Sequence, residues 1–405
     1  MSKSVWGRST FTAVLAAALA FAGSAFAQKQ YAPGVTDTEI KIGQTMPYSG
    51  PASGFSGIGK GAVAYFAMLN ERGGINGRKV NLLSQDDAYS PPKALEITRK
   101  LVEQDGVALM FGTLGAANNT VIRKYLNDNK VPQLFFAATA HELGDPAYPW
   151  TLGFAASGTI EGRIYGKYIL ANKPAARVGI LYQDDAFGRD YLKGLMEGLG
   201  DKAKSMVVAT ATYTPTDATV DSQLTTLAAA KADTLVLISI PKFTAQAIRM
   251  AYDTGWKPMM LMAGASNTMG QTLKPAGFDK SVGMLSAQFL KDPSDPAWKN
   301  DAGMNDFRAF MRKYAPNGDP TDFYYAYGYS LAQTLAEVLR RCGDNLTREN
   351  IMRQATNLKD LELPLLLPGI KVNTSPTNYH PITQMMMWRF DGANWQLFGK
   401  VMSSE

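Results

Sequence analysis

The sequence predicts an α/β protein built from two doubly wound lobes that are joined by three hinge crossings. Three observations carry this prediction. Strand and helix patterns alternate along the chain, a loop rich in proline and glycine at residues 144–153 interrupts them, and the alternation then restarts. Each connection between strands is long enough to carry a helix, which implies parallel strand pairs. A chain of 405 residues is also too long for one ordinary hydrophobic core.

The first block alternates strands with helices that begin and end at recognisable signals. Its first helix places Val63, Phe66 and Ala67 on one face, and the glycine-rich stretch at residues 73–77 then returns the chain. A proline favours the start of the second helix at residue 92. The expected strands are 39–45, 80–84, 108–111 and 133–136, and the expected helices are 59–70, 92–104 and 118–127.

The second block repeats this pattern after the interrupting loop, with apolar side chains again on one face of each helix. Such repetition predicts a second parallel sheet whose ligand-binding edge lies at the carboxyl ends of its strands. The expected strands are 178–182, 207–212, 234–240 and 259–262, and the expected helices are 189–199, 220–230 and 244–254.

The last third of the chain has too few strands for a sheet of its own. It shows helical patterns at 297–313 and 325–341, and a hairpin of residues 382–390 and 395–401 that turns at Asp391-Gly392. We therefore expect the chain to cross back and complete both existing lobes around a hinged cleft. The expected boundaries are 28–154 with 288–375 for lobe 1, and 155–287 with 376–405 for lobe 2.

The N-terminus has the features of a cleaved export signal. Lys3 and Arg8 are positive, residues 11–21 are apolar but too few to span a bilayer, and Ala25 and Ala27 supply small side chains before a cut. We expect a signal peptide at residues 1–27 and a periplasmic product. No cysteine follows the expected cut and no later apolar run reaches about 18 residues, so we expect neither a lipid anchor nor a transmembrane helix.

Composition excludes several classes of function. Cys342 is the only cysteine, which rules out an intramolecular disulfide and a cysteine-based metal site. The net charge of +6 is mild for this length and does not indicate nucleic acid. The only histidines are His141 and His380, with no second histidine of a zinc helix and no Gly-x-Ser-x-Gly motif. We expect no enzymatic activity, no cofactor and no metal.

Two local patterns resemble catalytic motifs but favour other roles. The glycine-rich segment 54–61 nearly matches a phosphate-binding loop, yet Gly61 stands where that loop needs Ser or Thr after the lysine. Such a turn into a helix exposes N–H groups that suit an anion such as a carboxylate. The paired carboxylates Asp86-Asp87 and Asp184-Asp185 follow strands, where such residues cap helices and form turns more often than they act as acid and base.

Aromatic residues gather where the predicted strands end. Tyr48 and Phe55 follow the first strand, Phe187 follows the first strand of the second block, and five aromatic residues crowd the segment 323–329. A helical face alone would place some of them in the core. Together they predict a cleft with an aromatic lining, as binding pockets usually have.

Several segments resemble the bacterial branched-chain amino acid binding proteins, which are the periplasmic receptors of ABC importers. The matching segments are YSGP at 48–51, NERGGING at 70–77, QDDA at 85–88, FGTL at 111–114, FAATAHEL at 136–143 and QDDAFG at 183–188. The resemblance implies the type I periplasmic binding fold, with two Rossmann-like lobes joined by three crossings. It also implies a monomer that captures a small molecule by hinge closure and presents it to the permease subunits of an importer.

The resemblance carries the family's pocket onto individual positions of this chain. Relatives that bind leucine place a serine on the ligand carboxylate at the start of a helix, where this chain has Ala116. Their loop that contacts the carboxylate and the ammonium group matches Ala137 to Thr139, and their two aromatic positions match Phe55 and Phe187.

Two further positions depart from the family pattern. Ile240 falls where relatives have a tyrosine, and Gly264 falls where they have the acid that pairs with the ligand's ammonium group. A buried ammonium group without its partner costs several kcal/mol. Phe55, Phe187, Ile240 and Tyr325 would instead form an apolar wall.

We therefore expect a ligand with a carboxylate and an apolar or aromatic body but no ammonium group. Its carboxylate would meet the N–H groups of Ala116 and Ala117 and the hydroxyl of Thr139. The alternatives are a branched-chain amino acid receptor of the same family, a sensory protein that signals its closed state, and an exported hydrolase or oxidoreductase.

Overall fold

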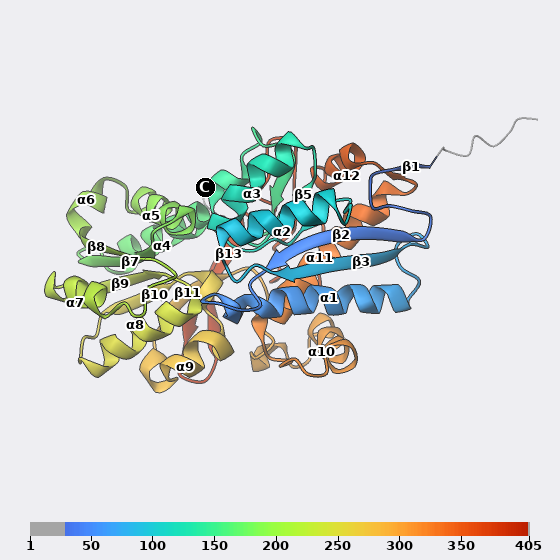
Figure 1. Cartoon of the computed structure of the whole chain (residues 1–405). Coiled ribbons are helices and arrows are strands. Elements are labelled where there is room, and N and C mark those ends of the chain that lie inside the picture. Colours follow the sequence, from blue (N-terminus) through green and yellow to red (C-terminus); the bar gives the residue numbers. More distant parts are fainter. Residues whose placement is uncertain (1–28, 404–405) are drawn as a thin grey trace, which may run out of the picture.

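The computed structural model describes residues 29–403, so the expected signal peptide at 1–27 lies outside the described residues. Two sheets form the centres of two lobes that lie side by side (Figure 1). The α/β fold with two parallel-sheet lobes that the sequence predicts is confirmed. Within the described part of the chain, no helix is both long and apolar enough to cross a membrane.

Lobe 1 is built on a five-stranded parallel sheet with the order β3-β2-β4-β5-β6. Its strands are β2 (Glu39–Met46), β3 (Lys79–Asp86), β4 (Met110–Phe111), β5 (Gln133–Phe136) and β6 (Thr151–Gly153). The helices between these strands are α1 (Ser56–Glu71), α2 (Pro91–Glu103) and α3 (Ala116–Asp128).

Lobe 2 is built on a seven-stranded sheet with the order β14-β13-β11-β10-β9-β7-β8. Its strands are β7 (Val178–Gln183), β8 (Val207–Tyr213), β9 (Thr234–Ile238), β10 (Met259–Met262), β11 (Leu285–Gln288), β13 (Gln384–Phe390) and β14 (Trp395–Ser403). Its helices are α4 (Gly158–Asn172), α5 (Ala186–Leu199), α6 (Ala203–Met206), α7 (Asp221–Ala229), α8 (Pro241–Asp253) and α9 (Lys274–Ala276).

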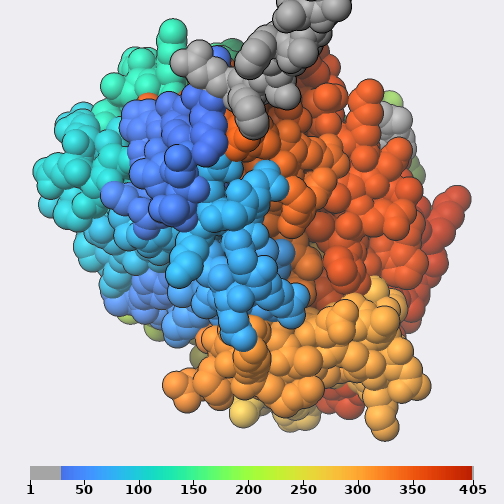
Figure 2. Space-filling view, turned by 90° about the vertical axis from the view of Figure 1, so that its right-hand side faces the viewer, coloured from blue at the N-terminus to red at the C-terminus, as the bar shows by residue number. Residues whose placement is uncertain are grey.

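The last third of the chain contributes elements to both lobes. The hairpin of β13 and β14 joins the sheet of lobe 2 antiparallel to β11. Three helices pack on lobe 1, namely α10 (Ala302–Tyr314), α11 (Phe323–Cys342) and α12 (Arg348–Ala355). The short strands β1 (Gln30–Tyr31) and β12 (Asn345–Leu346) pair with each other and connect the first segment of this lobe to its last. Segments from the two ends of the sequence therefore lie side by side on its outer face (Figure 2).

The pairing of α1 with α11 holds these distant segments together. Glycines let the two backbones approach, since a Cβ atom on Gly328 would lie 2.1 Å from the carbonyl oxygen of Ile58, and one on Gly61 would lie 2.7 Å from that of Tyr325. The chain passes between the lobes after β6, after β11 and before β13.

Helix α4 is the largest element that the sequence analysis does not predict, and glycines explain why. Glycine is unfavourable in helices, yet three glycines recur in α4 at intervals of four residues. They let α4 pack directly on the backbone of α5: a Cβ atom on Gly162 would lie 2.5 Å from the carbonyl oxygen of Tyr191, and one on Gly194 would lie 2.2 Å from that of Thr159.

Other departures from the expected elements are small. The strands β6 and β11 and the helix α12 are not predicted, because each is short. Helix α10 begins at Ala302 rather than at residue 297, because the Asp301 side chain caps it by accepting a hydrogen bond from Met304 N at 2.8 Å. Helix α3 begins at Ala116, two residues before the expected start, which brings its first turn to the cleft.

Replacement of Gly194 by alanine is expected to destabilise the protein by about 1–3 kcal/mol, because the new methyl group overlaps the Thr159 carbonyl. Thermal unfolding would show this as a lower Tm. Gly270→Ala is the matched control, because nothing lies within 4 Å of the Cβ atom that it adds. Equal losses of Tm in the two variants would contradict this account of the packing of α4 on α5.

Candidate ligand-binding site

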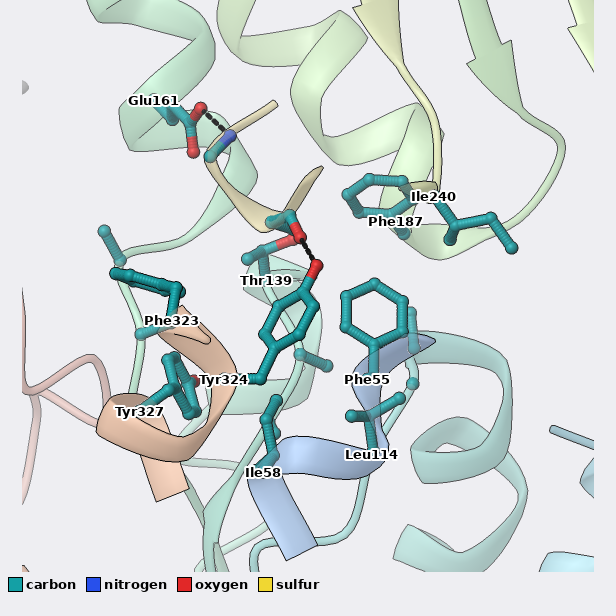
Figure 3. A pocket seen from close by; sticks show the side chains of 18 of the residues that line it. Phe55, Ile58, Leu114, Thr139, Glu161, Phe187, Ile240, Phe323, Tyr324 and Tyr327 are labelled. Carbon is teal, nitrogen blue, oxygen red and sulfur yellow. Dashed lines mark hydrogen bonds between the residues drawn. The ribbon is translucent and has the colours of Figure 1, made fainter. Parts of the chain in front are cut away.

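A cavity lies between the two lobes, at the edge where the carboxyl ends of both parallel sheets meet (Figure 3). It holds about 770 Å³ of empty space, part of which is open to solvent. Its lining consists of Phe55, Ile58, Tyr89, Leu114, Gly115, Ala116, Ala137, Ala138, Thr139, Ala155, Ala156, Glu161, Phe187, Ile240, Gly264, Ala265, Gln288, Phe289, Phe323, Tyr324, Tyr327 and Met385.

Most residues that the sequence suggests for the ligand site lie on this lining. They are Phe55, Ala116, Ala137 and Thr139 from lobe 1, and Phe187, Ile240 and Gly264 from lobe 2. Each follows the end of a parallel strand, either in a loop or in the first turn of the next helix. The parallel topology therefore gathers residues that are far apart in the sequence.

Tyr325 and Ala117 are expected at the site but do not line the cavity. The Tyr325 ring packs within lobe 1, against Gly318 and Gly57. Helix α11 presents Phe323, Tyr324 and Tyr327 to the cavity instead. These three side chains lie on one side of the helix, and Tyr325 lies on another. The sequence analysis predicted aromatic side chains of this helix at the site, but it chose Tyr325, which lies on a face that does not meet the cavity.

The first turn of α3 and the neighbouring Thr139 form the polar end of the cavity. Gly115 precedes the helix with a φ of 95°, and no side chain caps its first N–H groups. Thr139 Oγ1 is buried and forms no hydrogen bond within the protein. It lies near the Tyr191 hydroxyl and acts to lower the pKa of Tyr191. An uncapped helix start beside an unpaired hydroxyl offers hydrogen-bond donors to an anion.

Aromatic side chains form the wall of the cavity and connect the lobes. The rings of Phe55 and Tyr324 lie 5.0 Å apart, and Phe187 and Ile240 face them from lobe 2 (Figure 3). The Tyr324 hydroxyl donates a hydrogen bond to the carbonyl oxygen of Ala265 at 2.8 Å, which is a direct bond between the lobes. Burial raises the pKa of Tyr324 well above its ordinary value, so this hydroxyl keeps its proton.

A second polar link between the lobes involves a residue that the sequence analysis missed. Tyr89 follows β3 in lobe 1, and its hydroxyl accepts a hydrogen bond of 3.4 Å from Gln183 Nε2 at the end of β7. The Tyr89 backbone is left-handed, with a φ of 60°. Its ring covers Gly115, where a Cβ atom would lie 2.6 Å from it.

The expectation that no acid faces the cavity is wrong, because Glu161 of α4 lies on its lining. Its side chain is buried, and Oε1 accepts a hydrogen bond from Gly264 N at 2.6 Å. Oε2 accepts one from the Tyr191 hydroxyl at 2.5 Å, and the Tyr165 hydroxyl contacts Oε1. Burial raises the pKa of Glu161 to about 7.

The carboxyl group of Glu161 occupies the space beside Gly264. A Cβ atom at Gly264 would lie 3.2 Å from Glu161 Oε2. An acid therefore lies close to the position where relatives have one, but a different element supplies it. The sequence analysis did not find this acid, because it did not predict α4.

The other candidate catalytic residues have structural roles. Asp185 caps α5 by accepting a hydrogen bond from Gly188 N, and Asp86 accepts one from Tyr48 N. The rings of His141 and His380 stack on each other at 4.4 Å and do not belong to the cavity lining. No cluster of three or more His, Cys, Asp or Glu side chains among residues 29–403 could hold a metal ion.

Residues 39–394 match the model of a family described as periplasmic binding protein. The chain belongs to this periplasmic binding protein family. The Leu/Ile/Val-binding protein of Escherichia coli K12 is 27% identical over 183 residues, which span 45% of this chain and about half, 47%, of that relative. A leucine-, isoleucine-, valine-, threonine- and alanine-binding protein of Pseudomonas aeruginosa is 25% identical over 82% of this chain and 84% of its own length.

Solved structures of periplasmic binding proteins share the fold. The structure of a branched-chain amino acid ABC transporter protein from Thermus thermophilus with bound valine has a TM-score of 0.81 at 16% identity, and it covers 91% of this chain and 97% of its own. A fatty acid ABC transporter substrate-binding protein from Thermomonospora curvata has a TM-score of 0.75 at 19% identity, and covers 93% and 95%. The resemblance to the branched-chain amino acid binding proteins is confirmed.

Loss of the Tyr324 hydroxyl is expected to favour the open form of this periplasmic binding protein. Tyr324→Phe removes one hydrogen bond between the lobes, worth about 0.5–1.5 kcal/mol, so the ratio of closed to open molecules should fall about two- to tenfold. Small-angle X-ray scattering of ligand-free protein should show a larger radius of gyration. Tyr325→Phe is the matched control, since this ring packs within lobe 1. Identical scattering from both variants and the native protein would contradict the role of this bond.

Proposed function

We propose that this protein is the periplasmic solute-binding component of an ABC importer and that it captures a small carboxylate with an apolar or aromatic body. The observation that carries the proposal is the cavity between the lobes, which combines an uncapped helix start and an unpaired buried hydroxyl with an apolar and aromatic wall. The family of solute-binding relatives supports a transport role rather than an enzymatic one.

The ligand carboxylate binds at the first turn of α3. Its oxygens accept hydrogen bonds from the N–H group of Ala116, which lines the cavity, and from the Thr139 hydroxyl. A buried hydroxyl without a partner is costly, and a carboxylate supplies the acceptor that Thr139 Oγ1 lacks. The partial positive charge at the helix start adds to the attraction for the anion.

The body of the ligand lies against the aromatic wall and couples binding to hinge closure. Phe55 and Tyr324 contact it from lobe 1, and Phe187 and Ile240 contact it from lobe 2. A ligand shifts a conformational equilibrium only when it binds one state better. Contacts from both lobes exist only in the closed form, so the bound ligand stabilises that form for recognition by the permease subunits.

A branched-chain amino acid receptor is the second candidate, and Glu161 is the observation that favours it. An ionised Glu161 on the cavity lining would offer a partner to an α-ammonium group. The Pseudomonas aeruginosa relative is named for amino acids, whereas the Thermomonospora curvata structure is named for fatty acids, so both ligand classes occur among similar proteins.

A thermal-shift screen separates the two candidates. Protein freed of ligand by unfolding and refolding should show a higher Tm with benzoate and other aryl carboxylates, because a ligand that binds only the folded state stabilises it. Leucine and valine should change the Tm little. A large shift with leucine and none with the aryl carboxylates would reject the proposed ligand class.

Replacement of Thr139 by valine tests the carboxylate contact. The variant loses a hydrogen bond to a charged group, worth about 1.5–3 kcal/mol, so calorimetry should show benzoate affinity reduced about tenfold or more. Stability should not fall, since Thr139 Oγ1 has no partner in the protein. Thr272→Val is the matched control, because its hydroxyl is also buried without a partner but lies off the cavity lining. Equal affinities of both variants would contradict the contact.

A further inference from the structure

The hydroxyl of Tyr165 has more neighbours than one hydrogen can serve. It contacts Glu161 Oε1, lies 2.6 Å from the carbonyl oxygen of Met262, and accepts a hydrogen bond from Ala287 N at 3.1 Å. A phenol carries a single hydrogen and can donate one bond. Two oxygen neighbours at hydrogen-bond distance therefore require a second hydrogen from one of them.

Only the carboxyl group of Glu161 can supply that hydrogen. A backbone carbonyl has no proton to give, so Tyr165 donates to Met262 and Glu161 in its protonated form donates to the Tyr165 oxygen. If Glu161 were ionised, one of the two short contacts would join oxygen atoms with no hydrogen between them. Ser286 Oγ lies 3.5 Å from the Tyr165 hydroxyl and 3.1 Å from Met262 O, but a hydrogen donated by Ser286 would lie neither between Tyr165 and Glu161 nor between Tyr165 and Met262.

The surroundings of Glu161 also disfavour a charge. It takes part in no ion pair within the described residues. The hydrogen bonds that it accepts from the Tyr191 hydroxyl and from Gly264 N favour its ionised form, but burial is the larger effect and raises its pKa. Among the titratable groups of the neighbouring elements, Asp190 of α5 accepts hydrogen bonds from Thr159, and His141 lies close enough to Asp190 to influence its pKa. An unpaired charge buried in such a place is strongly unfavourable.

We propose that Glu161 is a specificity-determining residue that stays protonated in the closed cavity, so that the receptor binds carboxylates without an ammonium group and rejects amino acids. The proposal rests on the proposed function for its choice of ligands. Burial, which raises the pKa of Glu161 to about 7, agrees with the hydrogen count. A neutral Glu161 gives an ammonium group no counter-charge and does not repel a ligand carboxylate.

Binding of a carboxylate should therefore be linked to proton uptake. The negative ligand disfavours ionisation of Glu161 and raises its pKa further in the complex. With a free-state pKa of about 7, Glu161 is mostly neutral at pH 6 and mostly ionised at pH 8. Carboxylate affinity is then fully present at pH 6 and falls as the pH rises through 7, by up to about tenfold at pH 8.

The first test needs no ligand. Protein labelled with ¹³C at the glutamate carboxyl groups is titrated by NMR, and Glu161→Gln assigns the resonance by its loss. We expect a midpoint near 7 for Glu161, whereas the ordinary range of a glutamate carboxyl group is about 4–5. A midpoint of Glu161 in that ordinary range would overturn the proposal and leave the proposed function untouched.

The second test measures benzoate and leucine binding by calorimetry at pH 6 and pH 8, in buffers with different ionisation enthalpies. We expect benzoate to bind up to about tenfold more weakly at pH 8, with proton uptake. Glu161→Gln should remove this pH dependence, and Glu142→Gln should keep it. Leucine that binds with proton release would overturn the proposal by making Glu161 the ammonium partner. If benzoate fails at both pH values while Glu161 titrates near 7, the proposed ligand class fails and the assignment of a neutral Glu161 stands.

Discussion

The meeting of two parallel sheets at their carboxyl ends is the constraint on which the site depends. The parallel strands of each sheet all end on the same edge, so the loops that follow β2, β4 and β5 in lobe 1 face those that follow β7, β9 and β10 in lobe 2. The three crossings of the chain keep the two edges opposed. The cavity is thus a consequence of topology, while its chemistry depends on which residues stand at the strand ends.

The chemistry of the cavity is divided between one polar end and a long apolar wall. The start of α3 and Thr139 offer donors without partners, and the opposite aromatic residues offer surface that water solvates poorly. The hydrogen bond from Tyr324 to Ala265 closes the wall between the lobes. Glu161 is an acid on the cavity lining, and it accepts a hydrogen bond from Gly264 N.

Much of the fold could be read from the sequence, because periodic apolar patterns and long crossovers are local signals. Aromatic residues after the predicted strands indicated Phe55 and Phe187, and the family resemblance indicated Thr139 and Ile240; the structure gathers all four in one cavity. Tyr325 was misplaced, because a cluster of aromatic residues does not reveal which face of its helix meets the cavity.

The sequence analysis could not place Glu161 at the cavity, and the reason is physical. Its helix contains glycines that are unfavourable in isolation and become favourable only when α5 packs directly against them. Such a long-range close approach leaves no periodic apolar pattern in α4, only glycines at intervals of four residues. Only the three-dimensional structure therefore reveals the acid beside Gly264 and the hydrogen-bond partners around the Tyr165 hydroxyl.

The most direct test of the central claim is the identity of the molecule that the native protein carries. The receptor would be isolated from periplasm under native conditions, its bound ligand released by denaturation, and the released molecule identified by mass spectrometry. The account predicts a carboxylate with an apolar or aromatic body and no amino group. Recovery of leucine, isoleucine or valine in stoichiometric amounts would contradict it.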